Sequence, residues 1–228
     1  EYLPDWAQPA TGSATTALID AVGPGIYLDT RPDLRSAKAR MAVPLYYRTD
    51  THWNRAGAWV AYRSLANELG RTEPQLRWLS YRDARITGLA EREGGDLANF
   101  LWLTDWLRDQ KVIFDFEPPS SIEQVDPATG RVIDAGGDPL PSDPMQATLV
   151  RSPNAFNHAK VLWLHDSFGT ALAPFMAATF TEILQLHYHA TDPVLFAELV
   201  RTFKPDYVLV SVVERDVRVD WFVKTPGR

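Results

Sequence analysis

The chain contains no cysteine among its 228 residues. This absence excludes disulfide bonds, thiolate metal ligands and cysteine nucleophiles, so covalent catalysis would have to use another side chain. No apolar run is long enough to cross a bilayer. No Gly-rich phosphate-binding loop is present either, which leaves nucleotide chemistry without support.

Positive charge is also scarce, because 23 Lys and Arg residues face 29 Asp and Glu residues, for a net charge of -6. A nucleic-acid-binding protein needs a basic face, so we expect no nucleic-acid partner. The content of 45% hydrophobic and 23% charged residues is that of an ordinary globular protein. We predict a single domain over residues 1–228, with a hairpin-and-loop insertion at about 111–157 where Pro, Gly, Asp and Ser gather.

Apolar runs alternate with helical patterns in the last third of the chain. Residues 161–164, 182–186 and 207–213 predict strands, the last of them covered on both faces, and residues 168–180 and 193–203 predict helices. Nearer the N-terminus, we expect a strand at 26–28, a helix at 32–40, and a helix that Asn54 caps and that ends near Leu69. The fold class that these patterns predict is α/β, a three-layer sandwich with a mostly parallel sheet.

Two short segments carry the residue types of acyl transfer. Residues 50–54 read Asp-Thr-His-Trp-Asn, and an extended backbone there would point Asp50 and His52 the same way. Ser167 follows the strand at 161–164 and opens a helix, at the strand end where parallel sheets carry their sites. We predict that Ser167 is the nucleophile, His52 its base and Asp50 the group that orients His52, with the helix N-terminus facing the oxyanion.

Other roles stay open for these residues. An Asp-Ser pair before a helix is often only an N-cap, and Asp50 with Thr51 would also suit a cap. Imidazole and carboxylate are good zinc ligands, so His165 and Asp166 beside Asp50 and His52 would suit a metal. Their spacing matches no metal signature, however, and we predict no metal and no cofactor.

Aromatic residues offer further candidates. Tyr188 falls at a strand end between His187 and His189, and we expect an oxyanion or substrate-binding role for it. The two histidines would either line a cleft or be packed or solvated. Trp53, Trp102 and Trp106 would either form a platform for stacking sugars or belong to the core.

Several segments together resemble the alginate O-acetyltransferase family, whose domain is a circularly permuted SGNH-hydrolase-like fold. They are residues 46–54 with the following Gly57, residues 161–169, and residues 204–208 leading to Glu214 and Arg215. Residues 1–4 resemble the family's segment after its first strand, which implies that this strand and what precedes it lie outside the chain. Gly95, within Gly-Asp-Leu, and Arg215 resemble recurrent family positions, and we expect oxyanion or substrate-binding roles for them. His165 stands where the family usually has glycine, and residues 171–173 supply no matching aromatic.

The resemblance implies a periplasmic enzyme with its N-terminal signal or membrane anchor outside this chain. It would move acetyl groups onto exopolysaccharide hydroxyls, alginate or another, through an acyl-enzyme on Ser167. Its partners would be the polysaccharide acceptor and an acetyl donor delivered by a membrane-bound acyltransferase. Two alternatives stay open: a carbohydrate acetylesterase with the same triad, and a catalytically inert glycan-binding scaffold of a polysaccharide export assembly.

Overall fold

A computed structural model describes residue 6 and residues 14–22, 25–117 and 121–218. The chain forms two compact units, the first with residues 1–72 and 86–114 and the second with residues 73–85 and 115–228. The single domain with an insertion at 111–157 stays a prediction, because this division does not show whether the units fold separately. The family-like residues 1–4 lie outside the described residues.

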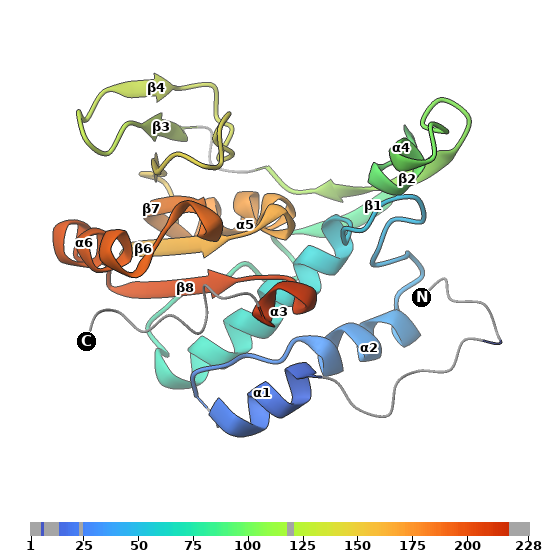
Figure 1. Ribbon diagram of the computed structural model, residues 1–228, viewed down its shortest axis with the longest axis horizontal. Coiled ribbons are helices and arrows are strands. Elements are labelled where there is room, and N and C mark those ends of the chain that lie inside the picture. Colours follow the sequence, from blue (N-terminus) through green and yellow to red (C-terminus); the bar gives the residue numbers. More distant parts are fainter. Residues whose placement is uncertain (1–5, 7–13, 23–24, 118–120, 219–228) are drawn as a thin grey trace. The chain divides into compact units, whose positions relative to one another are not determined.

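Helices and a two-stranded hairpin make up the first unit. The helices are α1 (Ala14–Val22), α2 (Arg31–Arg40) and α3 (Arg55–Thr72). Strands β1 (Arg85–Glu93) and β2 (Arg108–Asp115) pair with each other, and the short helix α4 (Asp96–Phe100) lies in their connection (Figure 1). The predicted helix at 32–40 is confirmed as α2.

Asn54 caps α3 as predicted. Its side-chain Oδ1 accepts hydrogen bonds from the backbone N–H groups of Ala56 (2.8 Å) and Gly57 (3.3 Å), two donors that the first turn leaves without helical partners. The predicted end near Leu69 is wrong, because the helix continues to Thr72. The strand predicted at residues 26–28 is also wrong: Ile26 is 84% exposed, and the three residues pair with no strand in the described part of the chain.

A six-stranded mixed sheet forms the frame of the second unit, in the order β4-β3-β5-β7-β6-β8. Its strands are β3 (Glu123–Val125), β4 (Val132–Asp134), β5 (Thr148–Arg151), β6 (Asn157–His165), β7 (Phe180–His187) and β8 (Tyr207–Ser211). Strand β6 pairs in parallel with β7 and β8, whereas β5, β3 and β4 are added antiparallel. The mostly parallel sheet was therefore a wrong prediction. The added strands are only three or four residues long, too short to show a periodicity in the sequence.

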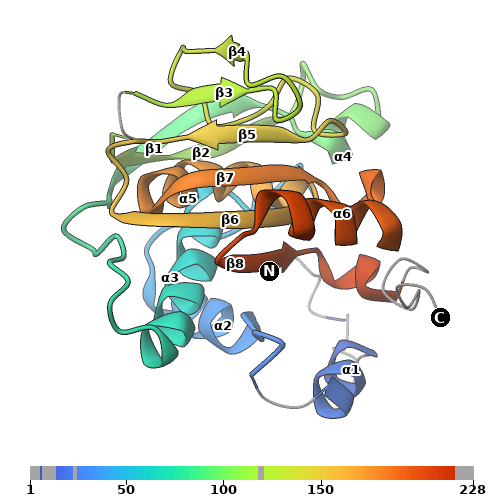
Figure 2. The same cartoon turned by 90° about the vertical axis from the view of Figure 1, so that its left-hand side faces the viewer.

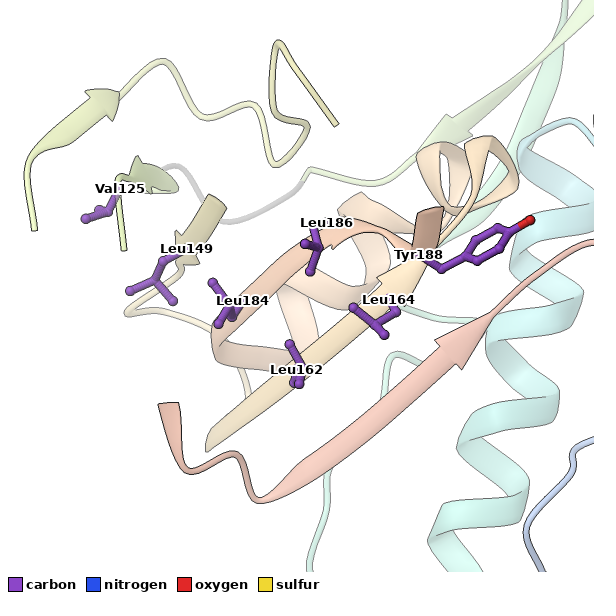
Figure 3. Close-up of a cluster of buried hydrophobic side chains, with 7 residues drawn as sticks. All are labelled: Val125, Leu149, Leu162, Leu164, Leu184, Leu186 and Tyr188. Atoms are coloured by element: carbon purple, nitrogen blue, oxygen red, sulfur yellow. The ribbon is translucent and has the colours of Figure 1, made fainter. Parts of the chain in front are cut away.

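The core of this unit lies on one face of the sheet, and leucines of β6 and β7 form its centre. Figure 3 shows the cluster, which consists of Val125, Leu149, Leu162, Leu164, Leu184, Leu186 and Tyr188. Helix α6 (Pro193–Phe203) packs its apolar side against this cluster, and α5 (Ala173–Thr179) lies on the opposite face of the sheet (Figure 2). Each fully buried aliphatic side chain of this kind contributes about 1.5–3 kcal/mol of hydrophobic stabilisation.

The C-terminal ends of the parallel strands β6, β7 and β8 lie side by side at the same end of the sheet. Short 3₁₀ helices follow each end: η1 (Ser167–Ala171), η2 (Tyr188–Ala190) and η3 (Glu214–Arg218). Ser167 and Tyr188 therefore follow strand ends as predicted, and Arg215 follows the end of β8. Strand β8 differs from its prediction, since it is an edge strand whose Val208 and Val210 are 41% and 43% exposed.

Candidate active site

Asp50 and His52 lie in a tight loop of the first unit. An isolated antiparallel bridge between Tyr46 and Trp53 closes its base, and the backbone N–H of Tyr47 donates to the carbonyl of His52 at 3.3 Å. The backbone bends through these residues, so the predicted extended conformation is wrong. The bend still joins the pair, because aspartate side chains readily accept from the backbone two residues on, here the N–H of His52 at 3.1 Å.

The imidazole of His52 is hydrogen-bonded to the carboxylate of Asp50. Nδ1 of His52 and Oδ1 of Asp50 are 2.6 Å apart, and the two side chains are 27% and 11% exposed. Because a carboxylate accepts, this geometry assigns the proton to Nδ1 and leaves Nε2 as the acceptor. The pair therefore has the form of a general base with an orienting acid.

Gly95 makes room for this carboxylate. A Cβ at Gly95 would lie 2.6 Å from Cγ of Asp50, closer than side-chain atoms approach each other. The backbone N–H of Gly95 donates to Oγ1 of Thr49 at 3.0 Å. The Gly-Asp-Leu segment thus packs directly on the Asp50 loop, and the predicted oxyanion or substrate-binding role of Gly95 stays a prediction.

A buried aspartate that the sequence reasoning missed fixes the start of the same loop. Oδ2 of Asp109, on β2, accepts from the backbone N–H groups of Arg48 and Thr49 and from Oγ1 of Thr49, at 2.9, 2.8 and 2.7 Å. Burial would raise the pKa of Asp109, but the hydrogen bonds from Thr49, Gln110 and Arg48 outweigh it and hold that pKa below its ordinary value. The ionised carboxylate therefore holds the loop.

A second missed aspartate, Asp96, approaches the base itself. Its Oδ1 accepts the backbone N–H of Thr51 at 2.7 Å, its Oδ2 accepts the Thr51 hydroxyl, and Oδ2 is 3.7 Å from Nδ1 of His52. Among the described residues, Asp50, His52 and Asp96 are the one group whose ligand-type atoms lie within 4.8 Å of one another. Because Nδ1 and both Asp96 oxygens are already hydrogen-bonded, we interpret the group as a charge cluster.

Arg92 of β1 completes the charges around the base. Its Nη2 is 3.6 Å from Oδ2 of Asp50, and its guanidinium lies over the ring of Tyr47, 4.2 Å from the centroid. Arg92 therefore faces the carboxylate oxygen that does not bond to Nδ1 of His52.

Ser167 lies in the second unit, at the turn from β6 into η1. It is exposed, whereas its neighbours Asp166 and Phe168 are buried. Asp166 caps η1, because its Oδ1 accepts the backbone N–H of Phe168 at 2.8 Å. The N-cap interpretation is thus correct for Asp166 and leaves the Ser167 hydroxyl at the surface. Helix η1 has five residues and 3₁₀ geometry, which gives a smaller dipole than the predicted helix would.

Asp166 also holds the loop after β8. Its Oδ2 accepts the backbone N–H of Val213 at 2.6 Å, and its own N–H donates to the carbonyl of Ser211 at 3.3 Å. Two residues further on, the guanidinium of Arg215 lies 5.8 Å from the ring centroid of Phe168. Arg215 is exposed and 3.8 Å from Oδ1 of Asp216, so a cation stands beside the serine turn.

His165 is buried directly beneath the serine turn. Its Nδ1 is 2.8 Å from the carbonyl oxygen of Asp166 and its Nε2 is 3.2 Å from Oε1 of Gln185. Burial lowers the pKa of His165, and the partial charges of Asp166 and Gln185 oppose this less strongly. A neutral, packed imidazole therefore occupies the position where the sequence resemblance expects glycine.

Tyr188 belongs to the core cluster and its side chain is fully buried (Figure 3). Burial, and then the nearby Asp216 carboxylate, raise the pKa of its hydroxyl to about 12. His187 stacks on its ring at a centroid distance of 5.0 Å, and His189 lies 4.2 Å away. His187 is half-buried and His189 is exposed, so the first is partly packed and the second solvated. The oxyanion or substrate-binding role of Tyr188 stays a prediction.

The connection between β1 and β2 presents aromatic rings to solvent. Phe100, Trp102 and Trp106 are 74%, 91% and 82% exposed, whereas Trp53 is half-buried. Trp102 adopts a left-handed backbone (φ 57°), which is strained for a bulky residue. Helix α4 is hydrogen-bonded to the loop that carries Asp50 and His52, because the N–H groups of Leu97 and Ala98 donate to the Thr49 carbonyl.

No helix in the described part of the chain is long and apolar enough to span a membrane.

The model of the AlgX acetyltransferase family, an SGNH hydrolase-like domain, matches residues 20–136, more than half of the chain. The chain belongs to this family. The matched segment includes the Asp50 loop, Arg92, Gly95, Asp96 and Asp109, and Ser167 follows it. No curated protein matches the chain closely.

Three solved structures are similar to parts of this AlgX-family chain to different degrees. A DHHW family protein from Eubacterium siraeum has a TM-score of 0.59 at 17% identity, over 83% of this chain and 64% of its own. PatB1 from Bacillus cereus has a TM-score of 0.56 at 19% identity, over 78% and 65%. The O-acetyltransferase domain of Pseudomonas putida AlgJ has a TM-score of 0.47 at 21% identity, over 87% of this chain and 63% of its own. The chain thus spans slightly less than two thirds of each of these proteins, and the first two share its α/β fold.

Proposed function

We propose that this protein is a serine-dependent O-acetyltransferase that moves acetyl groups onto hydroxyls of a bacterial exopolysaccharide, alginate or another. The observation that carries the proposal is the 2.6 Å contact between Nδ1 of His52 and Oδ1 of Asp50 in a chain of an acetyltransferase family. With the proton on Nδ1, Nε2 carries the lone pair that would act as the base. The exposed Ser167 at a strand-to-helix turn supplies the nucleophile.

The reaction has two halves. In the first, Nε2 of His52 takes the proton of the Ser167 hydroxyl as Oγ attacks the acetyl carbonyl of the donor, and the departing donor oxygen receives that proton from His52. In the second, His52 removes the proton of a sugar hydroxyl, whose oxygen attacks the acetyl-serine. Ser167 Oγ then leaves and is reprotonated, so the enzyme returns to its starting state.

Acceptor binding would use exposed groups near both parts of the site. Arg215 is exposed beside the serine turn and would contact the substrate, while Trp102 and Trp106 would stack on sugar rings. The aromatic connection is hydrogen-bonded to the loop that carries the base, so an acceptor held there would be held close to His52. We further propose a periplasmic location, an acetyl donor supplied by a membrane-bound acyltransferase, and a three-layer arrangement of the whole chain.

Intact-protein mass spectrometry after incubation with a small activated acetyl ester tests the mechanism. We expect an acetyl adduct on the wild type that maps to Ser167, and none on Ser167→Ala. His52→Gln should slow its formation, since the serine then lacks its base. Thr170→Ala is the matched control, because Thr170 is an exposed hydroxyl of the same short helix. Ester turnover that survives intact in Ser167→Ala would contradict the proposal.

A carbohydrate acetylesterase is the second candidate function, which the exposure of Ser167 to water favours. It would use the same acyl-enzyme and let water resolve it. Product analysis separates the two, because free acetate alone indicates an esterase and an acetylated glycan indicates a transferase. Glycan binding without any adduct would instead support the inert scaffold.

A further inference from the structure

His52 has a second carboxylate on the same side of its ring. Oδ2 of Asp96 is 3.7 Å from Nδ1, just beyond the 2.6 Å contact that Asp50 makes with the same atom. The side chains of His52 and Asp96 are 27% and 33% exposed, so their interaction is only partly screened by water. Both contacts lie within the first unit and depend on it alone.

Thr51 holds the Asp96 carboxylate in this place. Its backbone N–H and its hydroxyl donate to the two oxygens of Asp96, one bond to each. Two fixed bonds leave the carboxylate no freedom to turn away from the ring. Burial would raise the pKa of Asp96, but these bonds and the charge of His52 lower it below the ordinary value. Asp96 is therefore ionised at neutral pH.

Arg92 weakens the effect of the first carboxylate, Asp50, on the ring. It lies 3.6 Å from the outer oxygen of Asp50, so it offsets part of the negative charge that Asp50 presents to the imidazole. In the part of the chain that the structure describes, Asp96 forms no ion pair with an arginine or lysine, and its side chain contacts Thr51 and His52. Asp109, a third carboxylate that contacts the loop, accepts from the backbone N–H groups of Arg48 and Thr49. Asp96 thus adds a second negative charge beside the ring.

We propose that Asp96 is a positioning residue for the acyl transfer: it stabilises the protonated form of His52 that arises when Ser167 gives up its proton, an inference that rests on the proposed function. Asp50 keeps the Nδ1–H hydrogen bond throughout, and no proton moves to Asp96. The cluster of Asp50, Arg92 and Asp96 carries one net negative charge, which the imidazolium neutralises. Without Asp96, the same protonation step would leave a net positive charge.

Asp96→Asn tests this inference through two readouts on the full chain. The first is the acidic limb of the pH profile of kcat/KM for an activated acetyl ester, and the second is an NMR titration of the His52 ring, assigned by comparison with His52→Gln. Removing a negative charge disfavours the imidazolium, so we expect both midpoints to move down by about one pH unit. We expect kcat to fall about tenfold with little change in KM.

Three further variants separate charge from structure. Asp96→Glu keeps the charge and should restore the midpoint, and Arg92→Gln removes a cation and should move it up. Asp105→Asn removes an exposed carboxylate from the same connection and should leave it unchanged. A folded Asp96→Asn with an unchanged midpoint would overturn the inference. If Asp96→Asn does not fold, the Arg92→Gln variant takes its place. A His52 titration midpoint that does not rise in Arg92→Gln would then overturn the inference.

The NMR titration also separates this inference from the proposed function. It reports the coupling between His52 and Asp96 whether or not the protein transfers acetyl groups. Intact ester turnover in Ser167→Ala would refute the proposed mechanism, whereas an unchanged His52 titration in Asp96→Asn would refute only the role of Asp96.

Discussion

Gly169 lies directly against the imidazole of His165. A Cβ on Gly169 would stand 2.5 Å from Nδ1 of that ring and 2.6 Å from its Cγ, distances that side-chain atoms do not reach. The histidine is only 3% exposed, and its ring nitrogens lie 2.8 Å from the Asp166 carbonyl oxygen and 3.2 Å from Oε1 of Gln185, so the ring cannot move aside freely. The serine turn therefore passes over His165 only because residue 169 has no side chain.

Gly169→Ala should destabilise the fold by about 1–3 kcal/mol, the usual range for an added methyl group in a packed interior. The reason is the clash with His165, so His165→Gly should relieve it. Urea unfolding of the two single variants and the double variant measures this coupling. An equal loss from Gly169→Ala in both backgrounds would show that the clash lies elsewhere.

Gly95→Ala should impair the base without touching His52 directly. The added methyl group would meet Asp50 and push its carboxylate away from Nδ1, so ester turnover should fall at least tenfold. Gly88→Ala, on β1, is the matched control, because nothing lies within 4 Å of its would-be Cβ. Steady-state kinetics measures ester turnover in the two variants. Equal turnover would contradict the inference that space at Gly95 positions Asp50.

Asp109 should make stability depend on pH in the acid range. Its pKa is lower in the folded state than its ordinary 3.8, so the unfolded chain takes up a proton first as the pH falls. The stabilisation is complete above the unfolded pKa and is lost as pH falls through the folded one. Asp109→Asn should therefore unfold about 1–3 kcal/mol more easily at pH 7, with a smaller difference in acid. Urea titrations at several pH values measure this, with the exposed Asp105→Asn as control.

Trp102→Ala and Trp106→Ala should separate acceptor binding from chemistry. Both side chains are largely exposed, so the free energy of unfolding should change by no more than about 0.5 kcal/mol. Acetylation of a polysaccharide should fall several-fold, whereas turnover of a small ester should not. Trp6→Ala, a tryptophan 82% exposed elsewhere in the chain, is the control. Equal losses on both substrates would argue against a stacking role.

The sequence was informative about the base because Asp50 and His52 are neighbours. A pair two residues apart meets in an extended strand or in a bend, so the wrong backbone prediction did not separate them. Asp96 and Asp109 were missed because their partners Thr51 and Thr49 are 45 and 60 residues away. Such contacts depend on how the β1–β2 hairpin packs, and the Gly-Asp-Leu segment was noted only for its glycine.

The strands of the sheet also divide into those that the sequence predicted and those that it did not. Strands β6 and β7 are long, apolar and separated by helical segments, so local pattern alone located them. The strands β3, β4 and β5 have no such pattern, and their antiparallel pairing depends on a neighbour already being in place. Residues 26–28 show the opposite case, in which an apolar triplet without a neighbour stays out of any sheet.

Asp166 connects two segments that are 47 residues apart, because its two oxygens hold Phe168 and Val213. The nucleophile turn and the loop that leads to Arg215 are thereby joined at a single carboxylate. A lengthened or shortened loop after β8 would displace Ser167 together with Arg215. Evolution of a different substrate preference at this edge is therefore expected to proceed by exchanging side chains, with the lengths of both segments kept constant.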